Sequence, residues 1–263
     1  MPQTLYARKS IIKAGVCWAP RGRAPAHEAS RLRGCGRARR GGGRALPRPG
    51  GRDARACDGG ARRTPRRMYA LMRAQQTSAP VDFTRMRVFC VDELCPPAPS
   101  DGYFWRQITK EFASWAGVQP ARCRPFAVDA ADLPAMCKDY ERAITEAGGL
   151  DLVMLGLGPN AHIASHEPPA DFATSTCPVE LLSSTVDYIL TDEVIQGDVC
   201  ARAVSLGIQT ILSAREVLVL ASGATKRAAL RAMLHGPITP DVPASVLPRH
   251  PRCGVLADRD AAP

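Results

Sequence analysis

From residue 64 to the C-terminus, short apolar runs alternate with amphipathic stretches, and this alternation predicts the elements of the fold. Four apolar runs predict strands: MRVFCVDE (86–93), DLVMLGLG (151–158), EVLVLASG (216–223) and CGVLAD (253–258). The second and third are expected to be buried. A shorter run, RPFAV (124–128), is predicted as a further strand. Strands that alternate with helices indicate a parallel α/β sheet.

Apolar residues at helical spacing predict the helices between these strands. Pro65 suits a first helical turn, and Ser100 is expected to be the N-cap of the next helix. The predicted helices are TPRRMYALMRAQQ (64–76), SDGYFWRQITKEFASWAG (100–117), AADLPAMCKDYERAITEAGG (130–149) and ATKRAALRAMLHG (224–236). We therefore expect an α/β domain over residues 64–263, with a three-layer, doubly wound, mostly parallel, Rossmann-like sheet.

Residues 1–63 differ sharply from this domain. From residue 14 onward the segment consists almost wholly of Arg, Gly, Ala and Pro, without apolar periodicity. Such a composition buries too little apolar surface to offset chain entropy, so we expect disorder. GC-rich codons read out of frame give this composition, and we hypothesise that residues 14–62 are a shifted reading frame.

The charge of the chain divides at the same place. The net charge is +10, but residues 1–67 hold 18 Lys and Arg against 3 Asp and Glu, so the remaining domain is acidic. Nucleic-acid binding by the domain is therefore not expected. No apolar run approaches the length of a membrane span, and the N-terminus lacks the apolar core of a secretory signal. The ten cysteines form no C-x-x-C pair, and we expect reduced thiols in a cytoplasmic protein.

In parallel α/β sheets, ligands bind at the carboxyl ends of the strands, and GLGPNAHIASHEPP (156–169) directly follows one. His162 with Glu167 and Asn160 is a plausible general acid–base group, and Asn160 could hydrogen-bond the imidazole. The alternative is that His162 only caps the loop. His166 lies four residues after His162, but a third ligand and the H-E-x-x-H pattern are absent, so no metal site is expected.

Two further clusters follow predicted strands. Asp92 and Glu93 are adjacent, so at most one of them faces the pocket; the alternative is a pair of solvated turn acids. SGATKRAAL leads through a Gly-rich turn into a helix N-terminus, which suits a phosphate. A cation such as Lys226 is unfavourable in a first helical turn unless an anion binds there; the alternative is a surface lysine.

These three clusters together resemble the glucosamine-6-phosphate deaminase family, which shares its fold with 6-phosphogluconolactonase. Members of that family have a strand ending in D-E, then G-x-G-x-[DN]-G-H-I-[AG]-F-N-E-P, then an S/T-G-x-x-K turn. The similar segments here are VFCVDEL, GLGPNAHIASHEP and SGATKRAAL, with AVSLGIQTILSAREVLVL and VPASVLPRHP as further matches. The resemblance covers about residues 64–258.

The resemblance implies an enzyme that isomerises and deaminates glucosamine 6-phosphate to fructose 6-phosphate and ammonia, classed as a hydrolase of a C–N bond. Asp92 would move a proton between C2 and C1, and His162 would assist ring opening while Glu167 and Asn160 tune it. No metal or organic cofactor is implied, because the substrate's carbonyl acidifies the C2 proton. Substrate or phosphate contacts are implied for Thr64, Gly158, Ser222, Gly223 and Lys226.

Several residues depart from the family pattern. Asn160 stands where many members have Asp, and Ala161 replaces Gly, which strains the loop if φ is positive there. Ser165 and His166 replace Phe-Asn, and Val186 stands where the family has an arginine. Only Thr64-Pro65 and Tyr69 keep the pattern of the N-terminal phosphate loop.

Three alternatives remain open. The first is a lactonase of the same fold, in which His162 is the base and Asp92 has no proton-transfer role. H-I-A-x-x-E-P and T-I-L-x-A favour the deaminase, whereas Ala164-Ser165 is shared with the lactonase loop D-G-H-T-A-S-L-F-P. The second is a catalytically impaired relative. The third is a nucleic-acid binder that uses the Arg/Gly arm, although this arm has almost no aromatic residue beyond Trp18. We expect a small-molecule sugar phosphate as partner, no membrane and no nucleic acid, and the sequence allows a homo-oligomer.

Overall fold

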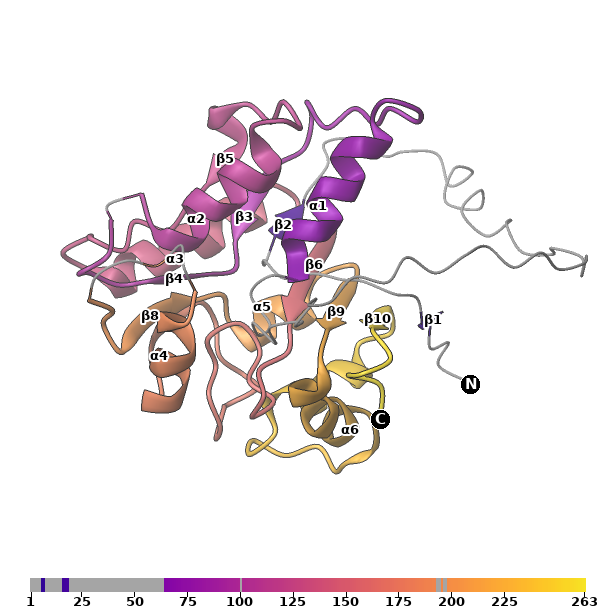
Figure 1. Cartoon of the computed structure of the whole chain (residues 1–263). Helices are drawn as coiled ribbons and strands as arrows, with labels where there is room; N and C mark the ends of the chain where they lie inside the picture. The colour runs from indigo at the N-terminus through magenta and orange to yellow at the C-terminus, as the bar shows by residue number, and fades with distance from the viewer. Residues whose placement is uncertain (1–5, 8–15, 19–63, 100, 193–194, 196–197) are drawn as a thin grey trace, which may run out of the picture.

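The computed structural model describes residues 6–7, 16–18, 64–99, 101–192, 195 and 198–263 (Figure 1). The hypotheses of disorder and of a shifted reading frame fall mainly on residues outside this set. Two short strands of the N-terminal segment are described, β1 (Tyr6–Ala7) and β2 (Val16–Trp18), and both pair with strands of the domain. No helix in the described ranges is long and apolar enough to cross a membrane.

The main sheet has seven strands, and the mostly parallel α/β fold predicted from the sequence is confirmed. Its order is β1-β10-β9-β6-β2-β3-β5. All neighbouring strands are parallel except β2, which runs antiparallel to both β3 and β6. The strands not yet bounded are β3 (Val88–Cys90), β5 (Cys123–Arg124), β6 (Leu152–Gly156), β9 (Val217–Ala221) and β10 (Cys253–Ala257).

A smaller antiparallel sheet contains β4 (Asp92–Leu94), β8 (Arg202–Ser205) and β7 (Cys177–Glu180), in the order β4-β8-β7. The predicted single strand over 86–93 is therefore wrong in one respect: it divides at Val91 between two sheets. The apolar run is continuous because β3 and β4 are both buried, although they pair with different strands. Asp92 consequently lies at the passage from one sheet to the other.

The helices connect the strands as the spacing predicts. α1 (Thr64–Gln75), α3 (Leu133–Glu146) and α6 (Arg227–His235) match predicted helices, and a 3₁₀ turn, Ala224–Lys226, precedes α6. α2 (Tyr103–Ile108) continues as a π-helical turn, Thr109–Ala113, on which α1 packs (Figure 1). The remaining helical elements are α4 (Ser183–Leu190), α5 (Ile208–Leu212) and the 3₁₀ segments Pro120–Arg122 and Pro243–Arg249.

Two local predictions are wrong. The run over 124–128 pairs as a strand only at Cys123–Arg124; Phe126 and Val128 are apolar because the following loop buries them. The N-cap of α2 is Gly102, at φ 70°, whereas Ser100 lies outside the described residues.

Tyr140 of α3 holds the region where β3 ends. Its hydroxyl donates to the carbonyl oxygens of Cys90 at 2.9 Å and Arg124 at 2.8 Å, and its ring stacks on Phe126 with centroids 4.0 Å apart. These contacts fix the chain immediately before Asp92. The seven cysteines from Cys90 to Cys253 are free thiols, and several pack in the core as small apolar residues.

Candidate active site

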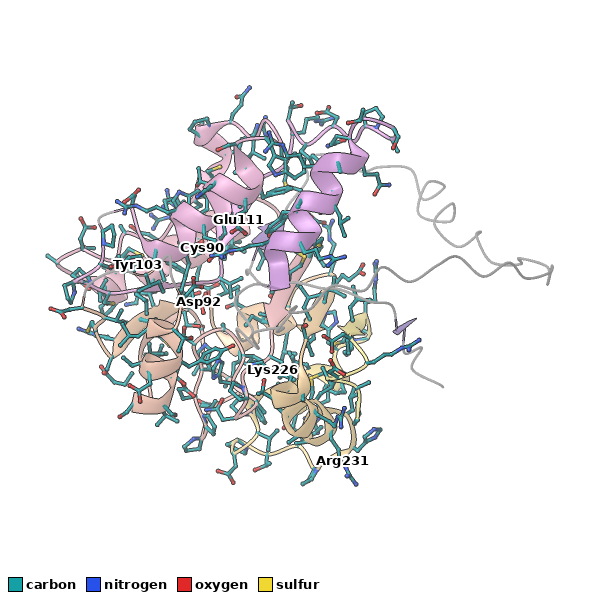
Figure 2. The ribbon with its side chains drawn as sticks, in the orientation of Figure 1. Cys90, Asp92, Tyr103, Glu111, Lys226 and Arg231 are labelled. Carbon is teal, nitrogen blue, oxygen red and sulfur yellow. The ribbon has the colours of Figure 1, made fainter. Side chains whose placement is uncertain are left out.

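A cavity of about 110 Å³ lies at the carboxyl ends of β3 and β6. Asp92 and His162 both line it, so the structure brings together two side chains that are 70 positions apart in the sequence. Cys90 ends β3 of the main sheet and Asp92 begins β4 of the small sheet, with Val91 between them (Figure 2). The other lining residues come from the β3–β4 junction, α2, β6 and the following loop, and α4 with the residues before it: Val91, Phe104, Gln107, Ile108, Met154, Leu155, Gly156, Ala164, Ser165, Leu181, Thr185, Tyr188 and Ile189.

The adjacent acids Asp92 and Glu93 have different environments, and only Asp92 lines the cavity. Glu93 is 1% exposed, and its carboxylate accepts hydrogen bonds from the backbone N–H groups of Leu94 and of the first turn of α2, Tyr103, Phe104 and Trp105. Burial raises the pKa of Glu93 to about 7, against the lowering effect of these donors. Glu93 is therefore the carboxylate cap of α2.

His162 is buried beside a carboxylate. Its Nδ1 lies 3.5 Å from Oε2 of Glu167, and Nδ2 of Asn160 donates to the same oxygen at 2.7 Å. Burial acts to raise the pKa of Glu167, but the hydrogen bond and charge of His162, with hydrogen bonds from Thr185 and Asn160, outweigh it and lower the pKa. Glu167 is thus held as a carboxylate beside the imidazole.

The side-chain amide of Asn160 has hydrogen-bond partners other than the imidazole that the sequence suggested. Its Oδ1 accepts from the backbone N–H of His162 at 3.2 Å, while its Nδ2 donates to Glu167. Asn160 therefore positions the loop and the carboxylate, in place of the predicted bond to the imidazole. The expectation that His162 and Glu167 lie together is met by the 3.5 Å contact.

The loop after β6 is tightly folded around His162. Ala161 has φ 65° and Ala164 has φ 51°, both in the left-handed region, which is costly for a residue with a Cβ. The strain predicted for Ala161 is therefore present. Gly158 donates its N–H to the carbonyl oxygen of His162 at 3.0 Å, and its missing side chain leaves space for the imidazole.

Ser165 was not predicted as a site residue. Its Oγ donates to Oδ2 of Asp92 at 2.9 Å. In the sequence, Ser165 departs from the Phe of the deaminase pattern and agrees with the lactonase pattern, but neither observation identifies its partner. The neighbouring His166 is 4% exposed, its Nε2 lies 3.0 Å from the carbonyl oxygen of Leu206, and burial lowers its pKa. His166 is therefore a neutral core histidine that packs the loop onto the chain after β8.

Lys226 is not a surface lysine. It is 1% exposed, and its ammonium lies 5.0 Å from the ring centroid of Tyr188, which lines the cavity. A buried ammonium over an aromatic face gains cation–π attraction and remains a strong point charge for an anion. Val186 packs in the apolar cluster around α4 and brings no cation.

In the predicted phosphate turn, Ser222 and Gly223 donate hydrogen bonds to a carboxylate of the protein itself. Ser222 Oγ donates to Asp258 at 2.6 Å, and the N–H of Gly223, at φ 87°, donates to both oxygens of the same carboxylate. Neither residue lines the cavity. Thr64 begins α1, and its side chain is outside the described part of the structure.

Comparison with known proteins places this arrangement in context. The sequence model described as "Glucosamine-6-phosphate isomerases/6-phosphogluconolactonase" matches residues 56–256. The chain is 34% identical over 202 residues to a glucosamine-6-phosphate deaminase of Halothermothrix orenii, covering 76% of this chain and 83% of that protein. It is 35% identical over 205 residues to glucosamine-6-phosphate deaminase 2 of Bacillus subtilis, covering 76% and 81%.

Solved structures agree on the fold. A monomeric glucosamine-6-phosphate deaminase superposes with a TM-score of 0.70 at 30% identity, covering 75% of this chain and 82% of that one. A 6-phosphogluconolactonase of Trypanosoma cruzi superposes with a TM-score of 0.57 at 17% identity, covering 75% and 79%. The latter likeness shows the shared fold alone.

Proposed function

Because this chain belongs to the glucosamine-6-phosphate isomerase/6-phosphogluconolactonase family, we propose that it converts glucosamine 6-phosphate and water into fructose 6-phosphate and ammonia. The observation that carries the proposal is the placement of the Asp92 carboxylate and the His162 imidazole on one cavity. The relatives that match over three quarters of the chain bear the name of this reaction.

Asp92 acts as the base in the proposed reaction. In the open-chain sugar, the carbonyl at C1 acidifies the C2 proton, so a carboxylate can remove it without a metal or an organic cofactor. Asp92 takes the proton from C2 and returns it to C1, and a second proton passes from the amine nitrogen to the C1 oxygen. C1 thereby becomes a hydroxymethyl group, and an imine remains at C2. Water then adds to this imine and ammonia departs. The chemistry is thus an isomerisation followed by loss of ammonia, and the description as a simple C–N hydrolase fits it loosely.

His162 supports the opening of the sugar ring. Ring opening requires a proton to leave the C1 hydroxyl and a proton to reach the ring oxygen, and an imidazole can transfer both. The carboxylate of Glu167, 3.5 Å from Nδ1, favours the protonated imidazole that forms during this transfer. Asn160 fixes Glu167 through its 2.7 Å hydrogen bond.

Lys226 supplies positive charge for the phosphate of the substrate. It is buried next to Tyr188, a lining residue of the cavity, so the phosphate is expected on this side. Gly158, Ser222, Gly223 and Thr64 are proposed as further substrate or phosphate contacts. For Ser222 and Gly223 this requires the phosphate to replace the carboxylate of Asp258 as acceptor.

The lactonase of the same fold is the competing function, and two substrates distinguish it. The full chain is assayed with glucosamine 6-phosphate and, separately, with 6-phosphogluconolactone. We expect equal amounts of ammonia and fructose 6-phosphate from the first, and lactone hydrolysis no faster than without enzyme. Lactone hydrolysis that Asp92→Asn retains, without ammonia release, would establish the lactonase instead. Asp139→Asn, an exposed acid on α3, is the matched control.

A further inference from the structure

The hydroxyl of Ser165 touches the proposed base directly. Its Oγ donates to Oδ2 of Asp92 at 2.9 Å, and Ser165 is only 7% exposed. We propose that Ser165 is a positioning residue for Asp92, which fixes the plane of the carboxylate toward C2 of the substrate. This inference rests on the proposed deaminase function and assigns a role to a position where the deaminase pattern has phenylalanine and the lactonase pattern has serine.

Ser165 is itself held by the small sheet. Its backbone N–H donates to Oγ of Ser205 at 3.2 Å, and Ser205 is fully buried. In the β4–β8 pairing, Ser205 is the residue directly opposite Asp92. One residue of β8 therefore fixes both the backbone that carries the hydroxyl and the strand that carries the carboxylate.

The loop around Ser165 allows little movement. Ala164 is in the left-handed region at φ 51°, and Ile163 and His166 form a β-bridge across the turn. The ring of His166 is anchored to the carbonyl oxygen of Leu206 at 3.0 Å, next to Ser205. A hydroxyl presented from such a turn orients its acceptor at a small entropic cost.

The hydrogen bond also favours the charged, proton-accepting form of Asp92. The other titratable groups near Asp92 have the following contacts in the structure. Glu93 turns its carboxylate to α2, and His166 is bound to Leu206. His162 faces the same cavity, and the thiol of Cys90 donates to the backbone carbonyl of Asp92 at 3.0 Å. The hydroxyl of Ser165 is the group that donates a hydrogen bond to the Asp92 carboxylate.

The test compares Ser165→Ala with Ser165→Thr, which keeps the hydroxyl, in the full chain. For Ser165→Ala we expect kcat to fall about tenfold while KM changes less than about twofold. The acid limb of the pH profile should move up by about one pH unit, because the carboxylate loses a donor. Ser165→Thr should restore most of kcat. Ser245→Ala removes another buried serine hydroxyl, which bonds Thr239 and does not line the cavity, and it should leave the acid limb in place.

An active wild type with an unchanged acid limb and kcat in Ser165→Ala overturns the inference while the deaminase function stands. If the wild type releases no ammonia, the function fails, and the inference is decided by NMR of Asp-labelled carboxyl carbons. The resonance lost in Asp92→Asn identifies the group. Its titration midpoint should rise in Ser165→Ala, and an unmoved midpoint overturns the inference.

Discussion

Gly158 lies so close to His162 that a Cβ on Gly158 would be 2.4 Å from Nδ1 of the imidazole. Gly158 itself is not among the residues with positive φ, so its requirement for glycine is one of space. The glycine after β6 therefore allows the His162 imidazole to pack directly against the backbone.

The substitution Gly158→Ala tests this contact. The added methyl group must displace the imidazole from Glu167, and we expect kcat/KM to fall about 100-fold, since misplacing a reacting group by about 1 Å has that effect. Gly254→Ala is the control, because a Cβ there would meet Leu218 at 3.4 Å, an ordinary contact. Steady-state kinetics and the unfolding free energy are measured together. Equal kcat/KM in Gly158→Ala and wild type would refute the role of the close approach.

Glu93 makes stability depend on pH in an unusual direction. Burial raises its pKa in the folded state to about 7 from the ordinary 4.5. Between these values the folded state keeps a proton that the unfolded state has lost, so stability falls as pH rises from about 4.5 to about 7. We expect this decline in the unfolding free energy of wild type measured relative to Glu93→Gln, with no further change above pH 7.

Chemical denaturation at several pH values gives the comparison. Glu146→Gln, an exposed acid near the end of α3, should follow wild type at every pH. A constant difference between wild type and Glu93→Gln from pH 4.5 to pH 7 would show that the buried carboxyl titrates normally.

Lys226→Met separates phosphate binding from chemistry. Methionine fills the buried volume without the charge, so we expect KM for the sugar phosphate to rise at least about tenfold with a smaller change in kcat. Inhibition by inorganic phosphate should weaken in parallel. Lys110→Met, an exposed lysine after α2, is the matched control. An unchanged KM and phosphate inhibition in Lys226→Met would remove Lys226 from the phosphate site.

Asp258→Asn tests the turn that leads into α6. Burial acts to raise the pKa of Asp258, but hydrogen bonds from Ser222, Ala261 and Gly223 outweigh it and lower the pKa. The substitution should therefore cost about 1–2 kcal/mol of unfolding free energy at pH 7. This difference should shrink as pH falls below the ordinary value of 3.8, because the wild-type carboxylate is then protonated. Denaturation at pH 7 and pH 3 measures it; a difference that does not depend on pH would contradict the account.

Periodicity predicted the parts of the fold that are buried on both faces. The strands over 151–158 and 216–223 are predictable because a buried parallel strand is a continuous apolar run. The strand over 253–258 is mostly half-buried, but its run is still apolar. The same signal could not show that the run over 86–93 divides between two sheets, because each half is buried and the division depends on distant partners. The strand prediction over 124–128 was wrong for a similar reason, because residues buried in a loop and residues buried in a strand both give an apolar sequence.

The sequence predicted the candidate site residues only where a single segment of the chain combines a buried strand with the reactive side chain that follows it. Asp92 and His162 follow buried strands, and the sequence placed both at the sheet edge. Glu93 was correctly separated from Asp92 by the alternation of side chains, but its capping of α2 depends on a loop that returns ten residues later. Ser165 was missed because its partner is determined by the β4–β8 pairing, which no local pattern encodes.

The release of ammonia and fructose 6-phosphate from glucosamine 6-phosphate, measured for the full chain and for Asp92→Asn, decides whether Asp92 is the base of a deaminase. We expect equal release of the two products by wild type and a rate lower by at least about a thousandfold in Asp92→Asn, because the base that moves the C2 proton is lost. No release from folded wild-type protein, or equal rates in the two proteins, would contradict this expectation.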